Sequence, residues 1–334
     1  MSRYIIAFVL LVQTCCFADK HLDEFYIQND TSLKTSNKVD LVIFSFDRPL
    51  QVYALLESCE HYFSGLNSLH LVYRCSDDAF NEGYKVVKKR FPYVIFHKQS
   101  NKKAGKDFKK LLLDAVFGKK SKARYIMFAV DDMLVTNFVN LSKCVDAMRK
   151  KHPWFFSLRL GKNIQLDTIL NIPCPPPKRK KYGKNMFSWK FKDGKGGWNY
   201  PNTVDMTIYR KKDVRYFLTK TPYTNPNILE GAWSLQKSKR RTGLAFNSSK
   251  VVNIPLNVVN PYWTSQSMEI PTSELLEIFN NGQKIDIAPF YKMRPYATHV
   301  PATFSYIPRK DPKSITHLTD PLYFLEEFRE PVSD

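Results

Sequence analysis

A regular alternation of short apolar runs with amphipathic segments, between about residues 38 and 150, constrains the fold most. The runs are rich in β-branched and aromatic residues, as buried strands are, and cover 38–46, 69–73, 93–96 and 124–130. Between and after them, apolar residues recur with helical spacing at 50–63, 76–87, 107–117 and 139–150. This order predicts an α/β fold with a doubly wound, mostly parallel, Rossmann-like sheet.

The second half of the chain differs in texture, because aromatic residues stand there among Gly, Asn and Pro. Its tryptophans and tyrosines include Trp189, Trp198, Tyr200, Tyr209, Tyr216, Tyr223 and Trp233. We expect an irregular α+β half. Its aromatic side chains either present a flat surface to a carbohydrate or simply fill a core.

The N-terminus predicts a cleavable signal peptide over residues 1–18. Arg3 precedes a short apolar run over residues 4–12, and Ala18 with Cys16 forms a small-x-small cleavage site. The protein would then enter the secretory pathway or be exported. An uncleaved segment would instead leave it membrane-associated or at the cytoplasmic face, and a buried N-terminal strand or helix is the alternative without targeting.

Several classes of function find no support in the sequence. The cysteines beyond residue 18 lack CxxC spacing, so neither a zinc site nor a redox pair is indicated. No GxSxG motif and no P-loop is present, which argues against serine hydrolases and the usual NTPases. Buried free thiols are expected for Cys59, Cys75, Cys144 and Cys174, with a disulfide possible in an exported protein.

The candidate site is an acidic pair, Asp131-Asp132, directly after the strand-like run that ends at Val130. Acidic pairs are common by chance, and three others stand in this chain, but only this one follows an apolar strand directly. Ligands of open α/β sheets bind beyond the carboxyl ends of the strands. Two carboxylates there suit a hard divalent cation and a diphosphate, or they cap the following helix.

The order of these elements resembles a glycosyltransferase of the GT-A fold. The resemblance rests on a first strand that closes on Ser45-Phe46-Asp47-Arg48-Pro49 and a later one that closes on Val130-Asp131-Asp132, which matches a degraded Asp-x-Asp motif. It implies that Asp132 is a direct metal ligand and that Asp131 orients the sugar or ribose. Ser45, Asp47 and Arg48 would contact the nucleotide. The cofactor would be a divalent cation, Mn²⁺ or Mg²⁺.

Three later residues extend the resemblance. Inverting members of the family use a carboxylate as general base toward the acceptor hydroxyl, and Glu230, in the segment 226–233, is the candidate. Asp205 competes with it for that role. His299 resembles the late histidine that completes the metal shell in some members. A lone histidine or acid is also often only structural.

The resemblance implies a domain organisation and a set of partners. Residues 1–18 would be the signal peptide, 37–160 the nucleotide-sugar-binding half, 161–305 the acceptor-binding half and 306–334 a tail. The donor would be a nucleotide-diphosphate sugar, and the acceptor a glycan or a phosphorylated molecule.

The positive charge bears on partners as well. Lys and Arg number 51 against 31 Asp and Glu, a formal charge of +20, and many lie in runs. Such runs are usually solvated faces, but they also suit an anionic membrane surface. Nucleic acid is not expected, since no helix-turn-helix, zinc-finger or RNP motif is present. The alternative function is an exported, non-catalytic binding protein on a GT-A scaffold that recognises an anionic polysaccharide or surface.

Overall fold

The structure is a computed structural model that describes residues 36–103, 105–259 and 267–310. The expected signal peptide and residues 311–334 of the expected tail lie outside the described residues. Within the described part, no helix combines the length and the apolar character needed to cross a bilayer.

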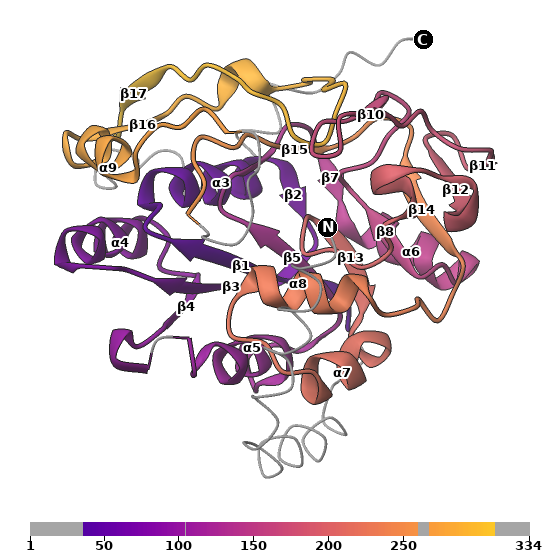
Figure 1. The fold of residues 1–334 in the computed structure, drawn as a ribbon, viewed down its shortest axis with the longest axis horizontal. Coiled ribbons are helices and arrows are strands. Elements are labelled where there is room, and N and C mark those ends of the chain that lie inside the picture. The colour runs from indigo at the N-terminus through magenta and orange to yellow at the C-terminus, as the bar shows by residue number, and fades with distance from the viewer. Residues whose placement is uncertain (1–35, 104, 260–266, 311–334) are drawn as a thin grey trace, which may run out of the picture.

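One nine-stranded sheet organises the molecule, with the strand order β11-β12-β14-β8-β13-β5-β1-β3-β4 (Figure 1). Every strand except β12 and β13 runs in the same direction. The strands are β1 (Ser36–Phe46), β3 (Leu66–Arg74), β4 (Ile95–Lys98), β5 (Ala123–Val130), β8 (Phe155–Ser157), β11 (Arg179–Tyr182), β12 (Met186–Lys190), β13 (Thr207–Arg210) and β14 (Thr242–Phe246). The α/β fold with a parallel centre is as predicted.

Helices cover both faces of this sheet, as a doubly wound fold requires. One core contains side chains of α3 (Pro49–Tyr62), α4 (Asp78–Arg90), α6 (Leu141–Lys151) and α9 (Thr272–Asn280). The other contains side chains of α5 (Phe108–Phe117), α7 (Lys211–Lys220) and α8 (Pro226–Ser234). Strand β1 alternates between the two, with Leu41 and Ile43 in the first core and Val42 and Phe44 in the second. A strand buried on both faces explains the continuous apolar run in the sequence.

Short elements complete the described fold. Paired strands outside the main sheet are β2 (Phe63–Ser64) with β7 (Val139–Asn140), β6 (Met133–Val135) with β15 (Val251–Asn253), β9 (Leu166–Asp167) with β10 (Ile172–Pro173), and β16 (Gln283–Ile285) with β17 (Tyr306–Pro308). Single 3-10 turns are η2 (Asn101–Lys103), η3 (Phe191–Asp193), η4 (Gly196–Asn199) and η5 (Ala288–Phe290). Strand β17 lies at the start of the expected tail.

The elements around the acidic pair differ from expectation in one useful way. Strand β6 follows Asp132 directly, and helix α6 starts only at Leu141. Its N-cap is Asn140, whose side chain accepts a hydrogen bond of 3.1 Å from the Lys143 amide. The acidic pair therefore does not cap a helix.

The second half of the chain is less separate than its sequence suggested. Strands β8, β13 and β14 are neighbours of β5 in the same sheet, so the sheet continues across residue 160. Most of its aromatic side chains are buried: Trp189, Trp198, Tyr209, Tyr223 and Trp233. They fill the core on the α5, α7 and α8 side, and Tyr216 is the exception with 72% exposure. Of the two interpretations of this aromatic region, the core holds for these five residues.

Candidate active site

The two predicted loops meet at the carboxyl ends of adjacent parallel strands. β1 pairs with β5, and Phe44 lies opposite Val130 near their ends. The backbone amide of Phe46 donates a hydrogen bond of 3.2 Å to Oδ2 of Asp131. The loop after β1 and the acidic pair after β5 therefore form one site, as the strand order in the sequence predicted.

Arg48 is the buried organiser of this site. Its Nη1 lies 2.8 Å from Oδ1 of Asp131, its Nε donates to Oδ1 of Asn257 at 2.7 Å, and its Nη2 donates to the backbone carbonyl of Asn257 at 2.6 Å. These contacts join the β1 loop, the β5 end and the distant segment around residue 257. Both oxygens of Asp131 are occupied, one by Arg48 and one by the Phe46 amide. In this state Arg48 and Asp131 position the site; their predicted contacts with nucleotide and sugar remain predictions.

Ser45 and Asp47 also have internal partners. The Ser45 hydroxyl lies 2.5 Å from the Tyr84 hydroxyl. Asp47 adopts a left-handed backbone with φ of 54° and accepts a hydrogen bond of 2.8 Å from the Ser76 amide. Asp and Asn tolerate that conformation better than most residues. These side chains shape the turn between β1 and α3, and their contact with nucleotide remains a prediction.

Asp132 differs from its neighbour, because little in the protein compensates its charge. Its Oδ2 is 4.0 Å from Arg48, its Oδ1 accepts a hydrogen bond of 3.3 Å from Asn253, and its side chain is 17% exposed. Burial, together with the nearby charges of Asp131 and Asp205, raises the pKa of Asp132 to about 6 against the opposing effect of Arg48. A mostly buried carboxylate with a raised pKa is a candidate ligand-binding group.

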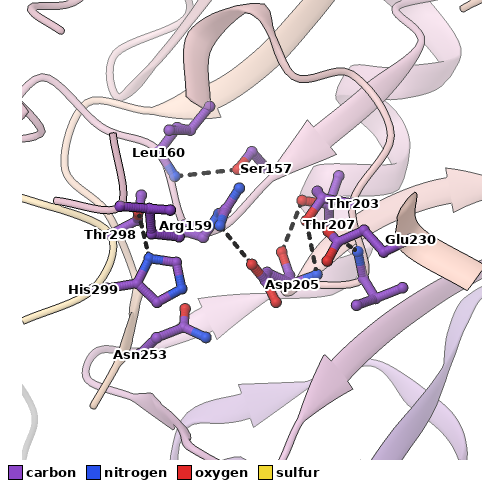
Figure 2. A network of polar contacts seen from close by, with 12 residues as sticks. Ser157, Arg159, Leu160, Thr203, Asp205, Thr207, Glu230, Asn253, Thr298 and His299 are labelled. Atoms are coloured by element: carbon purple, nitrogen blue, oxygen red, sulfur yellow. Dashed lines mark hydrogen bonds and ion pairs between the residues drawn. The ribbon is translucent and has the colours of Figure 1, made fainter. Parts of the chain in front are cut away.

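A second group of polar side chains comes from the other half of the chain (Figure 2). Arg159 follows β8, and its Nη1 lies 2.5 Å from Oδ2 of Asp205, which precedes β13. Asp205 is held further through its backbone, since its amide donates to Thr203 Oγ1 at 3.2 Å and its carbonyl accepts from Thr207 Oγ1 at 2.9 Å. The structure thus brings Asp205 beside the acidic pair, although it lies more than seventy positions further along the chain.

Glu230 lies on helix α8, not in the loop that its Asn- and Pro-rich surroundings suggested. Asn225 caps that helix by accepting a hydrogen bond of 2.9 Å from Ile228, and Pro226 at the first helical position suits the helix start. The Glu230 carboxylate accepts a hydrogen bond of 3.1 Å from the Val204 amide. Burial raises the pKa of Glu230 to about 7, with the charge of Asp205 adding to the effect and Thr203 opposing it.

His299 approaches the same site from the last part of the described chain. Its backbone forms an isolated β-bridge with Asn253, and the backbone amide of Asn253 donates a hydrogen bond of 3.0 Å to the Thr298 carbonyl. Burial lowers the pKa of His299 to about 4, although the charge of Asp205 opposes this. The imidazole is therefore neutral at physiological pH, which is the state that can ligate a metal.

The donors at this site suit a divalent cation. Asn253 Oδ1 is buried without a hydrogen-bond partner, beside the raised carboxylate of Asp132 and the neutral His299. Carboxylate, amide oxygen and imidazole are ligands of Mn²⁺, and the two oxygen donors suit Mg²⁺ as well. Within the described residues, no group of three or more His, Cys, Asp or Glu side chains could hold a metal.

Sequence reasoning missed three residues of this site: Arg159, Asn253 and Asn257. None stands in a motif or beside a predicted site residue. Arg159 meets Asp205, Asn253 meets Asp132 and Asn257 meets Arg48, at separations of 46 to 209 positions. No local signal marks such partners.

Comparison with known proteins provides one sequence relative. The chain is 27% identical over 219 residues to "Bifunctional glycosyltransferase pgtA" of Dictyostelium discoideum, a match that covers 58% of this chain and 28% of that protein. The chain therefore corresponds to less than a third of the length of this curated relative. No family model matches it.

Similar solved structures include the S. aureus TarS fragment 1-349. It is 13% identical, covers 63% of this chain and 59% of its own, and has a TM-score of 0.39. Its complex with UDP-GlcNAc is 12% identical, with coverages of 62% and 58% and a TM-score of 0.36. A 4-diphosphocytidyl-2C-methyl-D-erythritol synthase from Anaerococcus prevotii is 11% identical, with coverages of 69% and 92% and a TM-score of 0.35. Scores this low do not by themselves establish a shared fold.

The parallel α/β sheet and the position of the acidic pair at the end of β5 are observed directly in the structure of this chain. The curated relative agrees with the resemblance carried by Val130-Asp131-Asp132. The chain is thus similar in sequence to a glycosyltransferase, and its own geometry has the parallel sheet and the strand-end acidic pair that the GT-A resemblance implies.

Proposed function

We propose that this protein is a metal-dependent glycosyltransferase that moves a sugar from a nucleotide-diphosphate donor to a hydroxyl of a glycan or other acceptor. The observation that carries the proposal is that Asp205, Glu230 and His299 lie together (Figure 2) and that the charge of Asp205 also acts on Asp132 at the end of β5. The glycosyltransferase relative supports the same reaction class.

In the proposed mechanism, Asp132, Asn253 and His299 would hold a Mn²⁺ or Mg²⁺ ion, which would supply positive charge to neutralise the diphosphate leaving group. Arg48 keeps Asp131 fixed and leaves Asp132 more open to a ligand, since it lies 2.8 Å from the first carboxylate and 4.0 Å from the second. The loop of Ser45 and Asp47 is then set against the end of β5, where the nucleotide would lie.

We assign the general base to Glu230 rather than to Asp205. The charge of Asp205 is compensated by Arg159 at 2.5 Å, so we give it a positioning role. Glu230 has no ion pair among the described residues, and a pKa of about 7 suits a group that must accept a proton at neutral pH. Its carboxylate would take the proton of the acceptor hydroxyl as that oxygen attacks the sugar, in an inverting displacement.

The compartment of this reaction is proposed from the sequence alone. We propose a secretory or exported location, because residues 1–18 have the pattern of a signal peptide. A transferase in such a place needs a supply of nucleotide sugar, as in a secretory compartment of a eukaryotic cell.

The test is nucleotide binding with and without Mn²⁺, measured by calorimetry across UDP, GDP and CDP, followed by donor-sugar transfer assays. Asp132→Asn should reduce Mn²⁺-dependent binding by about a hundredfold or more, since a charged cation ligand is lost. Asp78→Asn is the matched control: this exposed acid lies in the other acidic pair near the end of a strand.

Asp77, the neighbour in that pair, is a poorer control. Its side chain caps α4 by accepting a hydrogen bond of 3.0 Å from Phe80. Metal-dependent binding that is equal in the wild type and Asp132→Asn would contradict the metal role. A wild type that binds anionic polysaccharide but no nucleotide would favour the non-catalytic binding protein.

A further inference from the structure

The edge of the sheet opposite the candidate active site is lined with positive charge. Because all strands except β12 and β13 run in one direction, the amino ends of β4, β5, β8 and β14 lie along one edge. The chain segments that lead into these four strands all carry exposed basic residues: Lys88 and Lys89, Lys119, Lys120 and Lys122, Arg149, Lys150 and Lys151, and Lys237, Lys239 and Arg241. We call this set the amino-edge basic face.

Strands β12 and β11 at the end of the sheet add to the same face. β12 ends there at Lys190, which pairs with Thr242 at the start of β14. β11 begins there, with Arg179 paired to Trp189, and both basic residues are exposed. Nine strands at the usual spacing make this edge roughly 40 Å wide. The basic residues therefore spread along a broad front rather than around a groove.

Helix ends explain only part of this face. Lys and Arg stabilise the last turn of a helix, which accounts for the basic residues that end α4 and α6. Lys119, Lys120 and Lys122 lie beyond the end of α5, and Lys239 and Arg241 lie well beyond α8. Exposed acids near this edge include Glu60, which pairs with Arg90 at 2.6 Å, Asp146, which lies 3.8 Å from Arg149, and Asp193, and the exposed basic residues outnumber them. Net positive charge remains.

We propose that the amino-edge basic face docks this protein on an anionic membrane surface. A broad front of exposed lysines complements a plane of acidic headgroups. In its described loops Phe91 and Trp154 are buried and Tyr93 is 51% exposed, so these loops do not offer the series of stacked aromatic platforms that single-stranded nucleic acids use. The polypeptide also enters the fold at this edge, since β1 begins at Ser36 opposite Ala123.

Docking by this face directs the opposite edge, with Asp132, away from the bilayer. The candidate active site would then face a nucleotide-sugar donor in solution and acceptors that extend from the membrane. This orientation rests on the proposed function, whereas the membrane binding itself does not.

The test is flotation of the full chain with vesicles of phosphatidylcholine alone or with about 30% phosphatidylserine, at about 0.15 M salt. The wild type should float only with the anionic vesicles. Two independent variants should each weaken binding at least about tenfold, as expected for loss of several lysines near a charged surface. They are Lys119→Glu/Lys120→Glu/Lys122→Glu and Lys237→Glu/Lys239→Glu/Arg241→Glu.

The matched control is Lys102→Glu/Lys106→Glu/Lys110→Glu. It changes the net charge equally, but these exposed lysines lie between the end of β4 and the first turn of α5, at the carboxyl edge. It should retain binding, and thermal unfolding of each variant checks the fold. An equal loss of vesicle binding in the control variant would show that only the net charge matters, and this would overturn the proposal. So would a wild type that does not float, or one that binds RNA or DNA more tightly than vesicles through the same lysines.

Discussion

The two edges of the sheet both hold buried charge, but they treat it in opposite ways. At the amino edge, Asp40 is fully buried and accepts hydrogen bonds from Asn67 and Ser68 on one oxygen and from Ser121, Ala123 and Lys211 on the other. At the carboxyl edge, Asp132 has one long hydrogen bond from Asn253 and stands among like charges.

The pKa values express the same contrast. Burial alone would raise the pKa of Asp40, but Lys211 at 2.7 Å and the surrounding donors lower it below its usual value. The pKa values of Asp132 and Glu230 are raised instead. A buried charge with a full set of partners stabilises one structure. A buried charge without them destabilises the free protein, and binding of a ligand or a proton relieves that cost. The comparison teaches that burial of a carboxylate does not itself mark function; the completeness of its partners does.

The largest effect is expected from removal of the cation at the amino edge. Lys211→Ala leaves Asp40 buried without its counter-charge, so the free energy of unfolding should fall by about 3–5 kcal/mol. Urea denaturation measures this. Lys212→Ala, at the exposed next position of α7, should change stability by less than about 0.5 kcal/mol. If Lys211→Ala lowered the free energy of unfolding only slightly, Asp40 would not depend on its counter-charge, and the contrast between the two edges would fail.

For Glu230, at the carboxyl edge, the main effect should be a loss of activity rather than a loss of stability. Glu230→Gln keeps the side-chain size and removes the proton acceptor, so the transfer rate should fall about 10²–10⁴-fold. Asp205→Asn should also lose stability, because it leaves Arg159 buried without its carboxylate partner. Initial-rate kinetics and urea denaturation of both variants separate the roles. A Glu230→Gln enzyme with a normal kcat would mean that another residue is the general base.

The pH dependence of transfer sharpens this assignment. Glu230 must be ionised to accept a proton, and its pKa lies at about 7. We therefore expect kcat/KM to fall by up to about tenfold per pH unit below that value, and to level off above it. A profile that is flat down to pH about 5 would contradict a base of raised pKa.

The smallest expected effect is on stability against pH, where the two edges contribute with opposite signs. Asp132 and Glu230 have folded pKa values above their ordinary ones, so their contribution to stability is complete at low pH and is lost as pH rises from about 4 to about 7. Asp40 has a lowered pKa, so its contribution is present above pH about 4 and is lost as pH falls further.

The double variant Asp132→Asn/Glu230→Gln isolates the carboxyl-edge term. It should gain about 1–3 kcal/mol relative to the wild type at pH 8 and almost nothing at pH 4, as measured by urea denaturation at each pH. A gain that is equal at both pH values would mean that ionisation of these two carboxyls does not destabilise the fold.

The sequence by itself determined the centre of this protein. The length of the apolar runs located β1, β3 and β5, because a strand buried on both faces must be apolar throughout. The helical periodicity of apolar residues between the runs located their helices. The break after Val130, on a strand of known direction, placed the acidic pair at the carboxyl edge beside Arg48. These are local patterns combined with a general rule of topology.

Only the tertiary structure decided which carboxylate does what. Asp131 and Asp132 look alike in sequence, but the first is held by Arg48 and the Phe46 amide, while the second faces Asn253. The partners Arg159, Asn253 and Asn257 reach the site from distant strands and loops. Likewise, Trp198 and Trp233 proved to be core residues only once β8, β13 and β14 had joined the sheet. Burial and charge compensation depend on neighbours in space, and for these residues the neighbours are remote in the chain.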